Sequence, residues 1–185
     1  ADIAAGLGAH QGEVIKLDTI RRLAELLKIS PLSLLGIGVE YFSRPVAFQE
    51  RFRQIAENVS EILWLANPEK TELLYINSRY TEIFGAPVEE LYADPRNLLN
   101  HIHREDRERV IAAFPRQLEG TYDEEYRIVR PDGGLRWIRD RAFPIHDAEG
   151  AVHRIVGVTE DITERKRAAE ERERLAAIVN SSQDA

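Results

Sequence analysis

Two histidines and an aspartate lie close enough in the sequence to hold a metal ion. They form the run His101-Ile-His103-Arg-Glu-Asp106, and imidazole together with carboxylate is a common ligand set for transition metals. The same residues also precede and begin an expected helix over 104–118, whose positive N-terminal end favours acidic side chains. We interpret the run as a helix start and expect no metal site.

A second group of side chains could line a ligand cavity. Trp64, Tyr126 and Trp137 fall on three different expected strands, and aromatic side chains that share the concave face of a sheet are typical of a ligand pocket. The alternative is that they only fill the hydrophobic core. The candidate ligand-binding residues are Ile62, Trp64, Tyr126, Ile128, Trp137 and Val156.

A third group stands where the last expected strand becomes a charged helix. It consists of Asp161, Ile162 and Thr163. An oxygen of Asp161 or Thr163 can accept a hydrogen bond from the free N–H groups at the helix start. Such a cap fixes the direction of the helix relative to the strand. This suits an ordinary structural cap and a signal relay equally, and we take these three residues as relay candidates.

Several common catalytic sites are excluded by the residues that the chain lacks. It contains no cysteine, so it has no disulfide, thiolate metal site, cysteine nucleophile or cysteine photoadduct. It also lacks a glycine-rich phosphate loop, a His-Glu-x-x-His zinc motif and a serine nucleophile elbow. We therefore expect no catalytic residues and no enzymatic activity.

The elements that position these candidate side chains are expected in the order of two strands, several short helices and three further strands. Turns at 131–134 and 147–150 separate the last three strands, and their glycines allow the backbone to reverse. The helical middle must cross one face to join both groups of strands into one antiparallel sheet. The expected strands span 62–66, 73–76, 122–130, 135–145 and 152–159, and the expected helices span 79–84, 88–92 and 104–118.

The charge balance limits the partners of the chain. Its 185 residues include 25 Lys and Arg against 32 Asp and Glu, a net charge of −7. This acidic balance gives no bulk attraction to nucleic acid or to an anionic membrane. No apolar run approaches the roughly 20 residues that span a bilayer. We expect a soluble, cytoplasmic protein that does not bind DNA specifically on its own.

Six short motifs, in a fixed order between Phe52 and Arg165, carry a family resemblance. The chain resembles a PAS domain of the subgroup with a PAC-type C-terminal half. The resemblance implies an α+β PAS fold, with a five-stranded antiparallel sheet and small helices on one face, flanked by N-terminal helices and a C-terminal linker helix. The motifs are Trp64-Leu-Ala with Tyr75-Ile-Asn, Tyr80-Thr-Glu-Ile-Phe-Gly, Ile102-His-Arg-Glu-Asp-Arg, Glu125-Tyr-Arg-Ile-Val-Arg-Pro-Asp-Gly, Arg136-Trp-Ile and Gly157-Val-Thr-Glu-Asp-Ile-Thr-Glu-Arg.

The resemblance also divides the chain. Residues 1–44 form a helical N-terminal segment, 45–163 the PAS domain, and 164–185 a signalling linker helix with the start of a further PAS domain. Within the first segment, 17–35 resembles the last two helices of repressor-type helix-turn-helix domains. The alternative for this segment is a pair of packing helices.

The cofactor stays open. A haem-binding PAS domain would need an imidazole on the helix 104–118, and that stretch contains no histidine. The lack of cysteine excludes the covalent flavin adduct and leaves non-covalent flavin as an alternative.

The resemblance implies a sensory and dimerisation module that relays a signal through the linker helix to an output domain, such as a kinase or a cyclic-nucleotide synthase. The alternative is a transcription regulator with a helix-turn-helix head. Two apolar helix stripes exceed what one small domain can cover, which predicts a homodimer. The candidate dimer residues are Phe48, Phe52, Ile55, Leu175 and Ile178.

Overall fold

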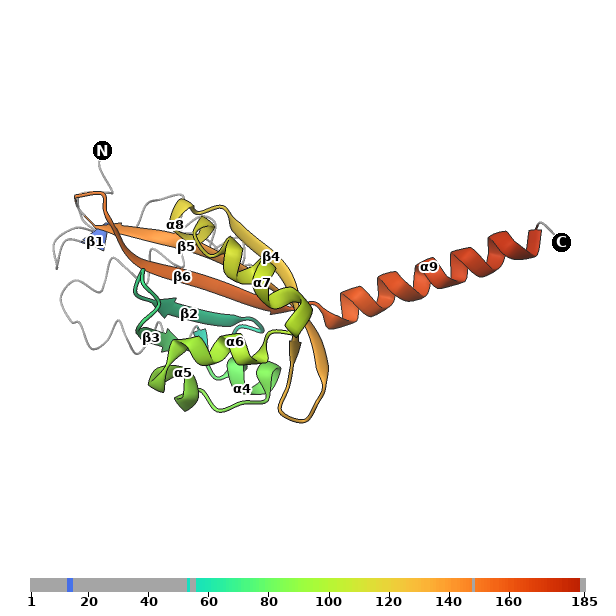
Figure 1. Cartoon of the computed structure of the whole chain (residues 1–185), viewed down its shortest axis with the longest axis horizontal. Coiled ribbons are helices and arrows are strands. Elements are labelled where there is room, and N and C mark those ends of the chain that lie inside the picture. Colours follow the sequence, from blue (N-terminus) through green and yellow to red (C-terminus); the bar gives the residue numbers. More distant parts are fainter. Residues whose placement is uncertain (1–12, 15–52, 54–55, 148, 184–185) are drawn as a thin grey trace.

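A twisted antiparallel sheet forms the body of the molecule (Figure 1). The computed structural model describes residues 13–14, 53, 56–147 and 149–183, without the side chains of 13–14 and 179–183. Five strands follow the spatial order β3-β2-β6-β5-β4, and the two-residue β1 pairs with the far end of β5. The strands are β1 (Glu13–Val14), β2 (Ile62–Ala66), β3 (Leu73–Ile76), β4 (Tyr122–Val129), β5 (Leu135–Asp147) and β6 (Val152–Asp161).

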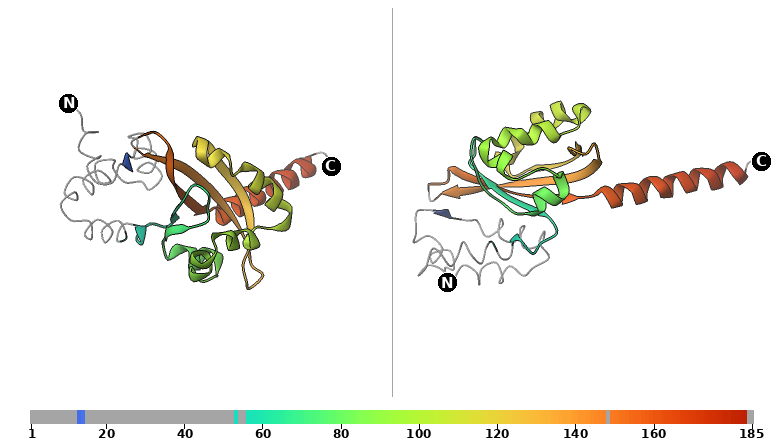
Figure 2. Two further views of the ribbon diagram at one scale, coloured as in Figure 1. Left: turned by 60° about the vertical axis from the view of Figure 1, so that its left-hand side comes forward. Right: turned by 90° about the horizontal axis from the view of Figure 1, so that it is seen from below.

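Short helices cover one face of this sheet (Figures 1 and 2). They join β3 to β4, so the helical middle of the chain crosses the sheet as the sequence predicted. Helix α4 ends at Gly85, whose φ of 72° is the left-handed conformation that glycine adopts without strain. The helices are α4 (Arg79–Phe84), α5 (Glu89–Ala93), the 3-10 helix η2 (Pro95–Asn97), α6 (Leu98–His101), α7 (Arg104–Ala113) and α8 (Arg116–Glu119).

The expected helix over 104–118 is wrong in its extent. The structure divides it into α7 and α8 at Phe114 and Pro115. Proline lacks the backbone N–H that a helix interior requires, and its ring clashes with the preceding turn. The five strands of the expected sheet are confirmed, each within two residues at either end.

The largest core cluster lies between the sheet and the helices, and a smaller one lies on the opposite face. In the smaller cluster Ala56 packs against Leu63 and Val158, so the segment before β2 covers part of the outer face. Asn77 fixes this segment: its side-chain N–H groups donate to the carbonyls of Ala56 (2.6 Å) and Glu61 (2.9 Å). The side chain is fully buried, and all of its partners are backbone groups.

Helix α9 (Thr163–Gln183) leaves the body directly after β6 and projects from it as a single rod (Figure 1). In the right-hand view of Figure 2 most of this helix extends beyond the end of the sheet. Within the described part of the chain, no helix combines the length and the apolar character needed to span a membrane. The rod is therefore a charged helix that emerges from one end of the sheet.

Candidate functional site

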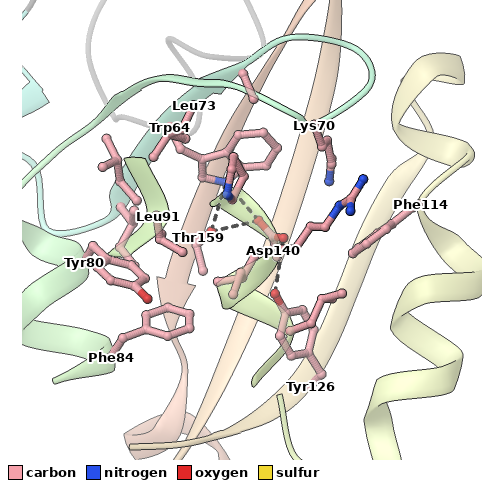
Figure 3. Close-up of a pocket in the computed structure, with 17 residues that line it drawn as sticks. Trp64, Lys70, Leu73, Tyr80, Phe84, Leu91, Phe114, Tyr126, Asp140 and Thr159 are labelled. Carbon is pink, nitrogen blue, oxygen red and sulfur yellow. Dashed lines mark hydrogen bonds between the residues drawn. The ribbon is translucent and has the colours of Figure 1, made fainter. Parts of the chain in front are cut away.

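A cavity of about 100 Å³ lies between the concave face of the sheet and the helices α4, α5, η2 and α6, with Phe114, which follows α7, at one side (Figure 3). Strands β2, β4, β5 and β6 form its floor, and the loop between β2 and β3 closes one side. Its wall is mostly apolar. The lining side chains are Ile62, Trp64, Ala66, Lys70, Leu73, Ile76, Tyr80, Phe84, Leu91, Pro95, Arg96, Leu98, Leu99, Phe114, Tyr126, Asp140 and Thr159.

A buried carboxylate stands on the floor of this cavity. Asp140 on β5 is only 3% exposed. Its Oδ1 accepts a short hydrogen bond from the Thr159 hydroxyl (2.7 Å) and a longer one from the Trp64 indole N–H (3.3 Å). Its Oδ2 accepts long hydrogen bonds from the hydroxyls of Tyr126 (3.3 Å) and Tyr122 (3.4 Å). Burial raises the pKa of Asp140 above its ordinary value, although these donors act against the rise.

A lysine enters the same cavity from the loop between β2 and β3. Lys70 has a φ of 54°, which is uncommon for a residue other than glycine. Its Nζ lies 4.1 Å from the centre of the Phe114 ring and 5.3 Å from that of the Trp64 ring (Figure 3). Such contacts stabilise a cation through the ring quadrupole. Burial nevertheless lowers the pKa of Lys70 to about 8, although the charge of Asp140 acts in the opposite direction.

The indole of Trp64 lies flat against strand β6. A Cβ atom at Gly157 would come within 2.1 Å of two atoms of the Trp64 ring, which is far inside van der Waals contact. Gly157 pairs directly with Trp64 across β2 and β6. The glycine therefore makes the space that the indole occupies on the cavity floor.

The lining residues do not fit a haem group, one of the cofactors considered from the sequence. The lining contains no histidine to coordinate a haem iron. The cavity suits a small molecule instead.

The structure brings together only some of the predicted ligand-binding residues. Ile62, Trp64 and Tyr126 line the cavity. Ile128 is fully buried in the adjoining core cluster and does not line it. The expectation is wrong for Trp137 and Val156, which lie on the opposite face of the sheet. Successive side chains along a strand point to opposite faces. Asp140 on β5 and Thr159 on β6 face the cavity. Trp137 and Val156 are an odd number of residues away from them on the same strands, so they face the other side. Sequence reasoning missed Lys70 and Asp140.

Trp137 lies instead at the base of helix α9. Lys166 Nζ is 4.8 Å from the centre of its ring, and the guanidinium carbon of Arg127 is 5.6 Å away. Lys166 also pairs with Glu125 of β4 at 2.6 Å, as does Arg165. The first turn of α9 is thus held against the outer face of β4 and β5 by one aromatic ring and one carboxylate.

The predicted relay residues form a compact joint between β6 and α9. Asp161 Oδ1 accepts hydrogen bonds from the backbone N–H (3.0 Å) and the hydroxyl (2.5 Å) of Thr163. The Thr163 hydroxyl oxygen accepts from the backbone N–H of Trp137 (3.0 Å), and the Ile162 N–H donates to the Trp137 carbonyl (2.9 Å). Arg136 contacts the second carboxylate oxygen of Asp161 at 2.6 Å. Burial opposes ionisation of Asp161, but the donors from Thr163 and Arg136 outweigh it and lower its pKa.

The residues of the His101-to-Asp106 run have separate partners. His101 Nε2 lies 2.7 Å from a carboxylate oxygen of Glu90. His103 caps α7 because its Nδ1 accepts a hydrogen bond from the backbone N–H of Glu105 in the first turn of the helix. Asp106 binds Arg127 through both carboxylate oxygens, at 2.8 and 2.9 Å, and this contact lowers the pKa of Asp106 to about 2. Among the described residues, no group of three potential metal ligands lies together.

The predicted dimer residues fall in two parts of the chain. Phe48, Phe52 and Ile55 lie outside the described residues, as does the helix-turn-helix-like stretch 17–35. Leu175 and Ile178 lie on α9, and each side chain is 53% exposed. The homodimer therefore stays a prediction.

Comparison with known proteins points to one family. The family described as the PAS fold matches residues 73–159. The crystal structure of a sensory box histidine kinase/response regulator from Burkholderia thailandensis is 31% identical in sequence. The match covers 71% of this chain and 98% of the crystallised chain, with a TM-score of 0.54. The crystal structure of the N-terminal domain of a diguanylate cyclase with a PAS/PAC sensor from Marinobacter aquaeolei is 25% identical. The match covers 57% of this chain and 98% of that domain, with a TM-score of 0.52.

The similarity extends to curated sequences that are much longer. An uncharacterized protein, y4lL, from Sinorhizobium fredii is 29% identical over 163 residues, which are 87% of this chain and 17% of that protein. The chain spans less than a fifth of the length of the curated relatives that it matches.

Proposed function

This chain belongs to the PAS family, and from that premise we propose that it is a sensory module that passes the state of its cavity to helix α9. In this proposal the chain binds a small molecule and catalyses no reaction. In this proposal the effector is an output domain that follows α9, of the histidine kinase or diguanylate cyclase type named for the proteins with similar structures.

One observation carries the proposal: the cavity floor and the residue that holds the start of α9 are two residues apart on β6. Asp140 and Thr159 pair directly across β5 and β6, and both line the cavity. Two residues further along β6 stands Asp161, which pairs with Ile138 and holds the N-terminus of α9. A ligand that shifts the Asp140–Thr159 pair therefore acts directly on the strand ends that orient the helix.

The joint is suited to transmission because it ties α9 to both strands. The side chain of Asp161 ties the helix to β6, and the Thr163 hydroxyl ties it to the backbone of β5. Loss of one helix cap costs about 1 kcal/mol, a modest part of the stability of a domain. A change in the direction of a rigid helix, by contrast, is carried along its whole length. The joint can thus affect signalling more than folding.

We test this with the double variant Asp161→Ala/Thr163→Ala in a fusion of the chain to a histidine kinase output domain. The expected result is a folded protein whose kinase activity no longer responds to changes in the cavity. The matched control is Asp147→Ala, because Asp147 makes the same kind of turn contact (2.8 Å to the Ala151 N–H) at the opposite end of the β5–β6 hairpin. A double variant that unfolds, or that signals as the control does, would show the joint to be structural only.

A further inference from the structure

Neither of the two cations that line the cavity forms an ion pair within the described part of the chain, although the charge of Asp140 acts on Lys70. Lys70 and Arg96 both line it, Lys70 half-buried and Arg96 exposed, so only Lys70 is partly withdrawn from water. Among the described residues, none accepts a hydrogen bond from the Lys70 ammonium or forms an ion pair with the side chain of either residue. An ammonium has three donors, and burial of a charge without hydrogen-bond partners is costly. The arrangement leaves donors that a bound anion would satisfy.

The buried acid of the cavity does not offer a comparable site for a cation. Both oxygens of Asp140 already accept hydrogen bonds from neighbouring side chains: Oδ1 from Thr159 and Trp64, and Oδ2 from Tyr122 and Tyr126. A cationic ligand would also meet the repulsion of Lys70 and Arg96. The unfilled hydrogen-bonding capacity of the cavity is therefore on its cationic side.

The remaining wall suits an apolar body. Aliphatic and aromatic side chains surround the space opposite Lys70 (Figure 3), and apolar pockets with a few polar groups are the usual form of a small-molecule site. The volume of about 100 Å³ restricts the ligand to a short chain or a single ring. The apolar lining includes Ile62, Trp64, Leu73, Ile76, Phe84 and Leu91.

We propose that the cavity binds a small monocarboxylate with an apolar body. The carboxylate pairs with Lys70 and Arg96, and the apolar part packs between Trp64, Phe84 and Leu91. This inference rests on the proposed function, because it names the class of molecule that the sensory module detects. The lowered pKa of Lys70 is consistent with it, since the fold disfavours the charged ammonium and a bound carboxylate would stabilise that form.

The test measures binding of two carboxylates of different shape, benzoate and hexanoate, to the purified chain at pH 7 by isothermal titration calorimetry. Benzyl alcohol and benzylamine serve as the neutral and cationic analogues. Trp64 lies in the cavity and Trp137 lies outside it, so the fluorescence of a Trp137→Phe variant reports on the cavity alone. We expect at least one carboxylate to bind, and to bind roughly tenfold or more tightly than its analogues, which is the strength of one charge-assisted hydrogen bond.

Variants assign this preference to Lys70. Lys70→Met should weaken carboxylate binding roughly tenfold or more, and Lys70→Arg should retain most of it. The matched control is Lys166→Met, which removes a lysine that also lies over a tryptophan ring, but outside the cavity. This control should bind as the unsubstituted chain does. If Lys70→Met does not fold, the Lys70→Arg variant and the neutral analogues still decide the result.

Three results would overturn the inference: no binding of either carboxylate, equal binding of benzoate and benzyl alcohol, or unchanged binding by a folded Lys70→Met variant. None of them tests the joint at Asp161. If carboxylates fail to bind while the Asp161→Ala/Thr163→Ala fusion is uncoupled, only the ligand class is wrong. If carboxylates bind and the fusion stays coupled, the ligand class stands and the relay through the joint fails.

Discussion

Lys70 and Asp140 are ionisable residues that the fold holds in a mostly apolar cavity, where the charged form of each is disfavoured. Burial lowers the pKa of Lys70 to about 8 and raises that of Asp140. Neither charge is needed to form the core, which aliphatic and aromatic side chains supply. Residues that reduce stability in this way are typical of functional sites. We therefore expect the two residues to matter more for binding than for folding.

Replacement of Lys70 by Met should stabilise the domain at pH 7. The folded-state pKa of about 8 lies below the ordinary value of 10.5, so the folded protein disfavours the proton, and this cost is present in full below pH 8. Removing the charge should raise the free energy of unfolding by about 1 to 2 kcal/mol, less than the whole pKa shift implies because the side chain is only partly enclosed.

This advantage of Lys70→Met should fall as the pH rises from 8 to 10.5, because the lysine of the unsubstituted chain then loses its proton. The charged or titratable groups that line the same cavity are Asp140 of β5, Tyr126 of β4, Tyr80 of α4 and Arg96 of η2. Thermal unfolding followed by circular dichroism at pH 7 and pH 10 measures the difference. A variant that is less stable than the unsubstituted chain at pH 7 would contradict it.

At the scale of the elements, the two faces of β5 and β6 have separate roles. One face carries the cavity residues, and the other carries Trp137 and the base of α9. The sequence pattern gave the strands and turns correctly, because strand alternation and glycine turns are local signals. It could not decide which parity faces the helices where both faces of a strand carry apolar side chains, and this explains the error at Trp137 and Val156.

The same limits apply to the cavity itself. Asp140 alternates with the buried Ile138 and Ala142 on β5, so all three side chains point to the same face of the sheet. An acidic residue on a face that is otherwise apolar could have been recognised in the sequence as a candidate site residue. Lys70 gave no such signal, because it lies in a turn whose conformation depends on tertiary contacts. The break at Pro115, by contrast, follows from proline chemistry alone. Trp64, Tyr126 and the joint at Asp161 were found from residue types and spacing.

Helix α9 should mediate dimerisation. Leu175 and Ile178 are each 53% exposed on a helix that leaves the body of the domain, and apolar residues at this spacing can form a coiled-coil seam. The double variant Leu175→Glu/Ile178→Glu should weaken the dimer at micromolar concentration, as measured by sedimentation velocity. The control is Ala177→Glu, an exposed position on the opposite side of the helix. An unsubstituted chain that sediments only as a 21.1 kDa species would contradict the prediction.

At the scale of the whole molecule, the cavity and the helix α9 are separated by two residues of β6 and joined through Asp161. The central claim is that a change in the cavity reaches the output domain through this joint. Coupling of this kind is an interaction free energy between two sites, and a double-mutant cycle measures it. The claim therefore predicts that the effects of a cavity variant and of a joint variant are not additive.

The most direct measurement is the kinase activity of four fusions: unsubstituted, Gly157→Ala, Asp161→Ala/Thr163→Ala, and the triple variant. The methyl group at Gly157 must displace Trp64 on the cavity floor, because its Cβ would lie 2.1 Å from the ring. We predict that Gly157→Ala changes the activity when the joint is intact and has no further effect when the joint is removed. An equal effect of Gly157→Ala in both backgrounds, or no effect in either, would contradict the account.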